Sequence, residues 1–364
     1  MAPGLVVLKD GNVVVWSGSK VVKIDVQQKA ITISKDFEGL VNDVIEDKET
    51  FLVSHDKTVS IVDPLKMELI QRFDVPRRPS KLCVVDQKCY IADKSGDVYL
   101  VDMSDEEIKE RTDVKTMKPI LGHISLIMDT FVSDKFIYTA EQDEKIKVSS
   151  RKHPFIIDHY LLGHTEYVSK IQVDEESNAL FSAGGDGTIR SWKNGKADNV
   201  KEHEEETVCH SLVASQDHLQ YATVSFEDNK DSCIRTVAKR DLAEYHTWKL
   251  EGGSVPISSA ANSTGLGAYW LIEKEKSLQL YFAKDKELEL VLQDVVESSW
   301  KEDHWKVLKK QLEKSDNYEK YLQMREEGFK KARGGRKKQK RKIMEPNSDS
   351  NDAKKVNVET VTAT

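Results

Sequence analysis

The chain has 364 residues, 38% hydrophobic content and a formal net charge of −7 at pH 7. That length holds one large domain or two ordinary ones. Its apolar runs are far shorter than the roughly 20 residues that cross a bilayer, and Met1–Gly4 lacks the basic and long apolar regions of a signal peptide. We therefore expect an intracellular protein that does not bind membranes.

The charge is divided unevenly. Residues 330–342 contain no acidic residue and nine basic ones: Lys330, Lys331, Arg333, Arg336, Lys337, Lys338, Lys340, Arg341 and Lys342. Residues 343–364 carry a net charge of −2, so residues 1–329 must carry −14 to give the total of −7. Phosphate binding is driven by clustered Lys and Arg. The acidic part is therefore a poor general nucleic-acid clamp.

The four cysteines are Cys83, Cys89, Cys209 and Cys233, and no two of them form a Cys-x-x-Cys pair. Their spacing argues against a zinc ribbon and against a thioredoxin-type site. Cys209 precedes His210, but two adjacent side chains do not make a tetrahedral site without distant ligands. We expect no metal site, and reduced, partly buried thiols.

Short β-rich segments recur from the N-terminus onward, each after a turn. Their last residues fall at positions 25, 63, 102, 150, 193, 238 and 283. The spacing is close to the roughly 40–45 residues of a WD-repeat blade, a four-stranded antiparallel unit that must stack on its neighbours to bury its faces. We predict an all-β, seven-bladed WD-repeat β-propeller over residues 1–297. The last two positions depend on alternation alone.

Two copies of the unit are clear between residues 121 and 193. The polar residues at blade spacing are His123, Thr139 and Asp143 in the first copy and His164, Ser182, Asp186 and Trp192 in the second. Ser149 takes the position of the Trp in the first copy, which leaves that set incomplete. We expect a buried chain of hydrogen bonds from carboxylate to imidazole to hydroxyl to indole. A Ser-His-Asp nucleophilic triad is the alternative, but its repetition at blade spacing favours the structural role.

After Val291 the apolar period changes from that of a strand to that of a helix. Ser299 and Glu302 fit a capping box, and a helical segment is predicted over 298–333. An apolar stripe within it, formed by Tyr318, Tyr321, Leu322 and Phe329, either packs under the propeller or docks on a partner. Residues 334–364 form a basic and then polar tail without aromatics, which we expect to be disordered in isolation.

Catalytic motifs are missing from the sequence. It contains no Gly-x-Gly-x-x-Gly after a strand and no Walker loop, and Gly184–Gly187 falls where a hairpin turn belongs. We therefore predict no cofactor and a binding module rather than an enzyme.

Three segments, residues 91–99, 143–149 and 162–169, resemble the non-catalytic WD-repeat subunit of the tRNA (guanine-N7)-methyltransferase. The similarity is dense from about residue 90 to 193 and returns at 316–327. It implies a heterodimer whose catalytic subunit binds S-adenosylmethionine and methylates N7 of a variable-loop guanine. This chain would hold that partner in an active conformation and help position the tRNA. An acidic propeller would also meet a basic RNA-binding partner favourably.

The resemblance also implies the contact residues. Lys145 falls on the interface lysine of the family, Lys147 on a neighbouring basic position, and Lys94 is assigned to the same partner-binding group. Lys145 and Lys147 follow Asp143 in a blade turn, where side chains can project outward; solvated turn charge is the alternative. The basic run at 330–342 predicts a nuclear-localisation signal or RNA phosphate contacts, against a plain solvated tail.

Two other classes of function remain as alternatives. A substrate receptor of a ubiquitin ligase, or another general interaction platform, is disfavoured because Ser191–Asn194 lacks the Trp-Asp-x-Arg pattern of such receptors. A hydrolytic propeller enzyme would need Ser182 to be a nucleophile rather than a structural hydroxyl.

Overall fold

The structure is a computed structural model that describes residues 3–103, 117–174, 177, 179–204, 207–225 and 231–299. All of its strands belong to the compact unit Met1–Leu312. The predicted helical segment beyond Ser299, the tail at 334–364 and the basic run within them lie outside the described residues. Within the described part, no helix is long and apolar enough to span a membrane.

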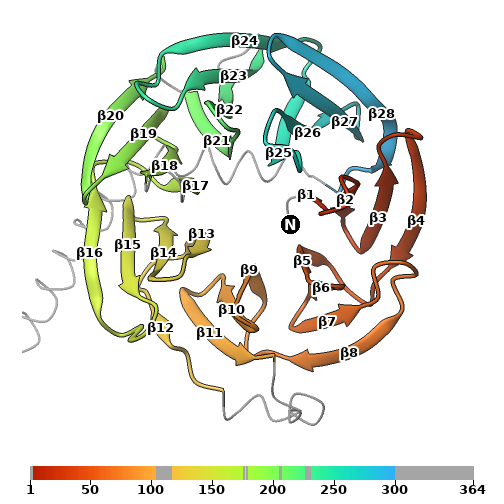
Figure 1. Cartoon of the computed structure of the whole chain (residues 1–364), viewed down its shortest axis with the longest axis horizontal. Coiled ribbons are helices and arrows are strands. Elements are labelled where there is room, and N and C mark those ends of the chain that lie inside the picture. Colours follow the sequence, from red (N-terminus) through yellow and green to blue (C-terminus); the bar gives the residue numbers. More distant parts are fainter. Residues whose placement is uncertain are drawn as a thin grey trace, which may run out of the picture. The chain divides into compact units, whose positions relative to one another are not determined.

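Seven four-stranded antiparallel sheets form a ring, with the first strand of each sheet innermost (Figure 1). Each sheet is a blade whose strands follow one another in chain order. Blade 1 contains β1 (Gly4–Val7), β2 (Val13–Ser17), β3 (Lys20–Asp25) and β4 (Ala30–Asp36). Blade 2 contains β5 (Val41–Asp47), β6 (Thr50–His55), β7 (Thr58–Val62) and β8 (Leu69–Asp74). Blade 3 contains β9 (Pro79–Val85), β10 (Lys88–Asp93), β11 (Asp97–Asp102) and β12 (Leu121–Gly122).

Blade 4 contains β13 (Ile127–Val132), β14 (Phe136–Glu141), β15 (Lys145–Ser150) and β16 (Ile157–Leu162). Blade 5 contains β17 (Val168–Asp174), β18 (Ala179–Gly184), β19 (Thr188–Lys193) and β20 (Lys196–Glu202). Blade 6 contains β21 (Thr207–Ala214), β22 (His218–Ser225), β23 (Ser232–Ala238) and β24 (Glu244–Leu250). Blade 7 contains β25 (Val255–Ala261), β26 (Ala268–Lys274), β27 (Ser277–Lys284) and β28 (Glu287–Glu297).

The predicted seven-bladed propeller is confirmed. The third strands end at residues 25, 62, 102, 150, 193, 238 and 284, within one residue of each predicted position. The two positions predicted from alternation alone, in blades 6 and 7, are therefore also third-strand ends.

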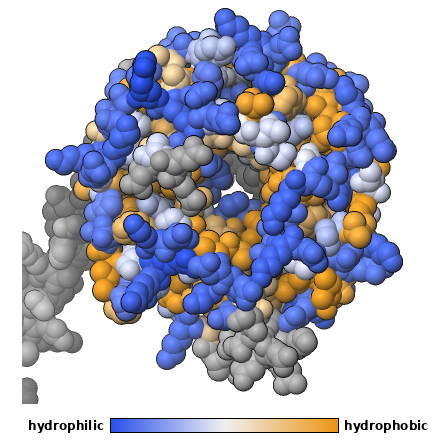
Figure 2. Space-filling view, in the orientation of Figure 1, coloured by the Kyte–Doolittle hydropathy of each residue, from blue (hydrophilic) through white to orange (hydrophobic). Residues whose placement is uncertain are grey.

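The core lies between the blades rather than at one centre. Every residue of β2 is buried, whereas β4, on the perimeter of the same blade, has no buried residue. A middle strand is covered on both faces by neighbouring blades and therefore reads as a continuous apolar run. The viewed face of the ring is mainly hydrophilic, with hydrophobic residues beside the central opening (Figure 2).

The last blade and the first share no strand. Serine hydrogen bonds and apolar packing join them instead. The Ser17 hydroxyl donates to the Glu297 carbonyl at 3.0 Å, and it accepts the Ser299 N–H at 2.9 Å. The Ser299 hydroxyl accepts the Gly18 N–H at 2.8 Å. Side chains of blades 1 and 7 share one buried cluster beneath these contacts. Ser299, expected to cap a helix, thus contributes to closing the ring.

Buried aspartates link neighbouring inner strands in the same way at two places. Asp43 of blade 2 accepts from Lys81 Nζ at 3.0 Å and from the Leu82 N–H at 2.8 Å. Asp129 of blade 4 accepts from the corresponding Lys and backbone N–H of blade 5, at 3.1 and 3.0 Å. These long-range pairs were not found from the sequence, whose repeated signal is an Asp on one inner strand and a Lys on the next.

Candidate functional site

The four polar residues of blade 5 form a continuous chain of hydrogen bonds. His164 Nδ1 lies 2.9 Å from Asp186 Oδ2, and His164 Nε2 lies 2.7 Å from Ser182 Oγ. Trp192 Nε1 donates to the same hydroxyl at 2.8 Å. With the imidazole proton on Nδ1, Asp186 accepts it, Nε2 accepts the Ser182 hydroxyl proton, and Ser182 accepts the indole N–H. Every group in the chain then has a partner.

The local sequence holds this chain in place. Gly184 is required because a Cβ there would lie 2.5 Å from both Asp186 Oδ1 and His164 Nδ1. Burial alone would raise the pKa of Asp186, but hydrogen bonds from His164, Thr165 and Thr188 outweigh it and hold the pKa below its usual value. Ser182 has no exposed surface. Its hydroxyl is therefore a structural group that substrate cannot reach.

The first copy is built differently, and this corrects the expected role of Asp143. His123 Nε2 contacts Thr139 Oγ1 at 2.9 Å, as the pattern predicts, but His123 Nδ1 contacts the Gly96 carbonyl of blade 3 at 2.7 Å. Asp143 instead accepts from Lys145 Nζ at 2.8 Å. A backbone carbonyl from the neighbouring blade has replaced the carboxylate.

The turn between β10 and β11 supplies that carbonyl and also carries Lys94. Asp93 Oδ1 accepts the Ser95 and Asp97 N–H groups at 2.6 and 3.1 Å, which fixes the turn. Gly96 adopts a φ of +99°, and a Cβ there would lie 2.7 Å from the Ser125 carbonyl oxygen. Only glycine fits this approach. Lys94 is exposed at the tip of the turn.

Lys145 and Lys147 are placed differently from each other. The Lys145 side chain is 44% exposed. Lys147 was expected to project outward, but it is 6% exposed and donates to the Gly122 carbonyl at 3.1 Å. Burial lowers the pKa of Lys147, against an opposing effect of Glu141. The expectation failed because Lys147 lies inside β15 on the face that turns toward blade 3, and charge alone does not reveal that register.

Glu141 adds a second buried ionisable group next to this lysine. Burial, together with the Asp143 carboxylate, raises the pKa of Glu141 to about 7. Its Oε1 lies 3.8 Å from His123 Nε2, and burial followed by the Lys147 charge lowers the pKa of His123 to about 4. Glu141, His123 and Lys147 thus form a cluster of buried ionisable groups close to Asp143, the partner of Lys145. Sequence reasoning did not single out Glu141.

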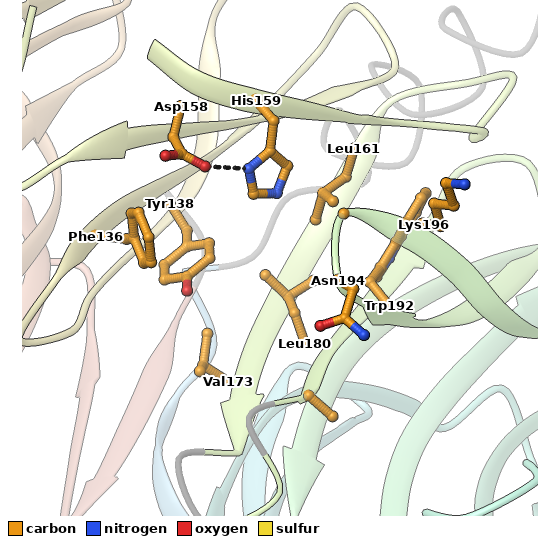
Figure 3. Close-up of a pocket in the computed structure, with 12 residues that line it drawn as sticks. Phe136, Tyr138, Asp158, His159, Leu161, Val173, Leu180, Trp192, Asn194 and Lys196 are labelled. Atoms are coloured by element: carbon orange, nitrogen blue, oxygen red, sulfur yellow. Dashed lines mark hydrogen bonds and ion pairs between the residues drawn. The ribbon is translucent and has the colours of Figure 1, made fainter. Parts of the chain in front are cut away.

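A cavity of about 510 Å³ lies between blades 4 and 5 (Figure 3). Its wall combines apolar and polar residues, among them Tyr138, Leu180 and Trp192, and Asp158 and His159 form a hydrogen-bonded pair of 2.7 Å at one side. None of the described residues that line it is a serine, threonine or cysteine. The Asp-His pair therefore has no Ser, Thr or Cys nucleophile beside it among these lining residues.

Metal ligands do not gather in the described part of the chain, where no group of three His, Cys, Asp or Glu side chains could hold an ion. Cys89, Cys209 and Cys233 are buried, Cys83 is partly buried, and all four thiols are free.

Comparison with known proteins points to one family. Residues 103–238 match the family described as the tRNA methyltransferase TRM82 WD40 domain. The resemblance inferred from the sequence is confirmed. The matched stretch contains blades 4 and 5, with both polar sets, Lys145 and Lys147, whereas Lys94 lies before it.

Relatives from fungi and from human agree. The tRNA (guanine-N(7)-)-methyltransferase non-catalytic subunit TRM82 of Candida glabrata is 32% identical over 208 residues, 55% of this chain and 48% of that protein. The TRM82 subunit of Eremothecium gossypii is 41% identical over 133 residues, 35% of this chain and 28% of that protein. The human subunit, WDR4, is 41% identical over 124 residues, 33% of this chain and 28% of that protein. The aligned stretch spans about half or less of each relative.

Among solved structures, the computationally designed Ika8 protein aligns with a TM-score of 0.55 and 17% identity. The alignment covers 79% of this chain and 81% of the designed one. At that identity the likeness concerns the fold alone.

Proposed function

We propose that this chain is the non-catalytic scaffold subunit of a tRNA (guanine-N7)-methyltransferase. It binds and stabilises a catalytic subunit and helps position tRNA for N7 methylation of a variable-loop guanine. The match of residues 103–238 to the TRM82 WD40 domain carries the proposal. The relatives named above are themselves non-catalytic subunits of that methyltransferase.

The geometry favours binding over catalysis. The Ser-His-Asp set of blade 5 is buried, and the cavity between blades 4 and 5 has no Ser, Thr or Cys among its described lining residues. Lys145, by contrast, is 44% exposed on blade 4, where its ammonium group pairs with Asp143 at 2.8 Å. Surface charge of this kind steers association with a complementary partner more than it raises affinity.

Complex formation tests the proposal. The purified chain and the catalytic subunit of a tRNA (guanine-N7)-methyltransferase are expected to co-elute as a 1:1 complex during size-exclusion chromatography. Lys145→Glu is expected to weaken the complex, whereas Lys135→Glu serves as its matched control. Lys135 is an exposed lysine of the same blade, in the turn between β13 and β14. Absence of a complex with the unmodified chain would overturn the proposal.

Two further parts of the proposal concern residues outside the described structure. The basic run at 330–342 directs the protein to the nucleus or contacts tRNA phosphates. Its nine positive charges in a segment without acids support both roles, because each needs clustered Lys and Arg.

A further inference from the structure

The cavity between blades 4 and 5 lies away from the turn that carries Lys145. Phe136, on its wall, begins β14 and pairs with Ser150, whereas Lys145 begins β15 at the other end of the same pair of strands. Asp158 and His159, also on the wall, lie near the start of β16. The cavity is therefore at the end of blade 4 opposite to Lys145, and a ligand bound in it would not touch that lysine.

The wall that blade 4 contributes is aromatic. Tyr138 pairs with Val148, which pairs with His159, so their side chains share one face of the sheet. Phe136, two residues before Tyr138 on the same strand, points to the same side. The rings of Phe136 and Tyr138 meet edge to face, with their centroids 6.1 Å apart. Blade 4 thus presents two aromatic rings and an imidazole to the cavity (Figure 3).

The opposite wall, which blade 5 contributes, is apolar where it is buried. Leu180 pairs with Val173 and with Trp192, which places these three side chains on one face of the sheet. All three are buried. Gly195, in the turn between β19 and β20, leaves room for the imidazole, because a Cβ there would lie 3.3 Å from His159 Cδ2. The buried part of this wall therefore offers apolar contact and no charge.

Hydrogen-bond acceptors gather at the polar edge of the cavity. Asp158 Oδ2 accepts a proton from His159 Nδ1 at 2.7 Å, which leaves Nε2 of the neutral imidazole as an acceptor. The Asp158 side chain is 50% exposed, and no lysine or arginine of the described part of the chain forms an ion pair with it. Asn194 adds an amide oxygen. This edge therefore favours a ligand that carries N–H donors.

Lys196 also lines the cavity, but its charge lies on the far side of it. The side chain is exposed, and its ammonium group points away from the other side chains drawn (Figure 3). Solvent screens a charge in such a position. Asp158 instead belongs to blade 4, as do the two aromatic rings. A cation on those rings would therefore have a carboxylate on its own blade and the lysine on the other.

We infer that this cavity binds an arginine side chain of a basic peptide. A guanidinium group carries five N–H donors in one plane and stacks on aromatic faces. Phe136 and Tyr138 contact its face, while Asp158 and His159 Nε2 accept its donors. A lysine ammonium lacks the flat surface, and an apolar side chain lacks the donors. The volume of about 510 Å³ is within the roughly 300–1,000 Å³ of ligand pockets.

The surroundings of the cavity favour a peptide over a free amino acid. Phe155, Ile156 and Ile157 are exposed immediately before Asp158 in the chain. Apolar residues on either side of the arginine would cover this surface. Charge agrees with a basic partner, because residues 1–329 carry a net charge of −14. Opposite charge speeds the encounter of two such molecules.

Calorimetric titration of the full chain tests the inference with a short blocked peptide that has one arginine between two leucines. The comparison peptide has citrulline at the same place, which keeps the shape of the side chain and removes its charge. The arginine peptide should bind at least about tenfold more tightly, because hydrogen bonds between charged groups are about twice as strong as neutral ones. Equal affinity for the two peptides, or no binding of the arginine peptide, overturns the inference.

Substitutions then locate the binding site. Asp158→Asn should weaken binding of the arginine peptide by about tenfold, and Phe136→Leu should weaken it by about threefold to tenfold through loss of the ring. Asp198→Asn is the matched control, because Asp198 is 40% exposed on β20 and does not line the cavity. Its effect should stay below about twofold. Unchanged binding by Asp158→Asn, or an equal loss in Asp198→Asn, contradicts the assignment; Asp158 is exposed, so its substitution leaves the core untouched.

Lys196→Ala separates a site for cations from a site for anions. It should leave the affinity for the arginine peptide unchanged or raise it by up to about threefold, because it removes a like charge. Weaker binding by this variant, or a preference for a peptide with glutamate in place of the arginine, overturns the inference. The inference does not depend on the proposed function. A chain that binds the peptide but not the catalytic subunit would refute the proposed function alone, and the reverse result would refute the arginine site alone.

Discussion

Replacing Ser182 by Ala removes the hydroxyl that joins His164 to Trp192. The substitution leaves two buried polar groups without a partner, the imidazole Nε2 and the indole N–H, which now lie 2.7 and 2.8 Å from Ser182 Oγ. An unsatisfied buried group costs about 1–3 kcal/mol, so the free energy of unfolding should fall by about 2–6 kcal/mol. That is a large share of a typical domain stability of about 5–15 kcal/mol.

Urea unfolding followed by far-ultraviolet circular dichroism measures this loss. Ser263→Ala is the control, because Ser263 is exposed, and its effect should stay within about 0.5 kcal/mol. Combining Ser182→Ala with Trp192→Phe should cost less than the sum of the two single changes by about 1–3 kcal/mol, because the phenyl ring no longer presents an unpaired N–H. An unchanged stability of Ser182→Ala, or strict additivity in the double variant, would refute the structural role of the chain of hydrogen bonds.

Three further predictions concern the rim and the tail. Lys145→Glu should weaken binding of the catalytic subunit and change the free energy of unfolding by less than about 1 kcal/mol. Lys147→Ala should lower the free energy of unfolding by about 1–3 kcal/mol, because it loses a buried hydrogen bond. Co-purification measures the first effect and urea titration the second. Because the pKa of Glu141 is raised from 4.5 to about 7, the folded chain retains a proton that the unfolded chain releases, so this residue lowers stability as pH rises through that window. The lowered pKa of His123 acts in the opposite direction between about pH 4 and 6.5, and Glu141→Gln should remove only the first contribution in unfolding curves recorded from pH 4 to 8. Deleting residues 330–342 should reduce nuclear accumulation of a fluorescent fusion, or reduce tRNA affinity with a smaller salt dependence.

Each of these has a contradicting result. Equal stability loss from both lysine variants would remove the distinction between rim and buried charge. A Glu141→Gln chain with the same pH profile as the unmodified one would contradict the raised pKa. If deleting 330–342 changes neither localisation nor tRNA binding, the run has no role beyond a solvated tail.

The sequence predicted the fold because each blade repeats one local pattern. The ends of the third strands followed from turns and alternation, and even blades 6 and 7, without the polar set, kept that alternation. The polar chain of blade 5 was predictable for the same reason, since a buried strand requires its polar groups to be paired. Local pattern was therefore sufficient for the strands and for the polar chain of blade 5.

Contacts between blades could not be predicted from the local sequence pattern. The Gly96 carbonyl that takes the place of Asp143 comes from the preceding blade, and nothing in the spacing of the first copy shows it. The burial of Lys147 depends on strand register and on the position of β12. The contact between Ser17 and Ser299 joins the first blade to the segment that follows the last one. The partner-binding role of Lys94 and Lys145 remains a prediction from the resemblance and the proposal above.

Methyl transfer to tRNA tests the central claim most directly. The chain, the catalytic subunit and their mixture are each incubated with tRNA and labelled S-adenosylmethionine, and label at N7 of guanine is measured over time. We predict no transfer by the chain alone and faster transfer by the mixture than by the catalytic subunit alone. Transfer by the chain alone, or a mixture no faster than the catalytic subunit, would contradict the scaffold function.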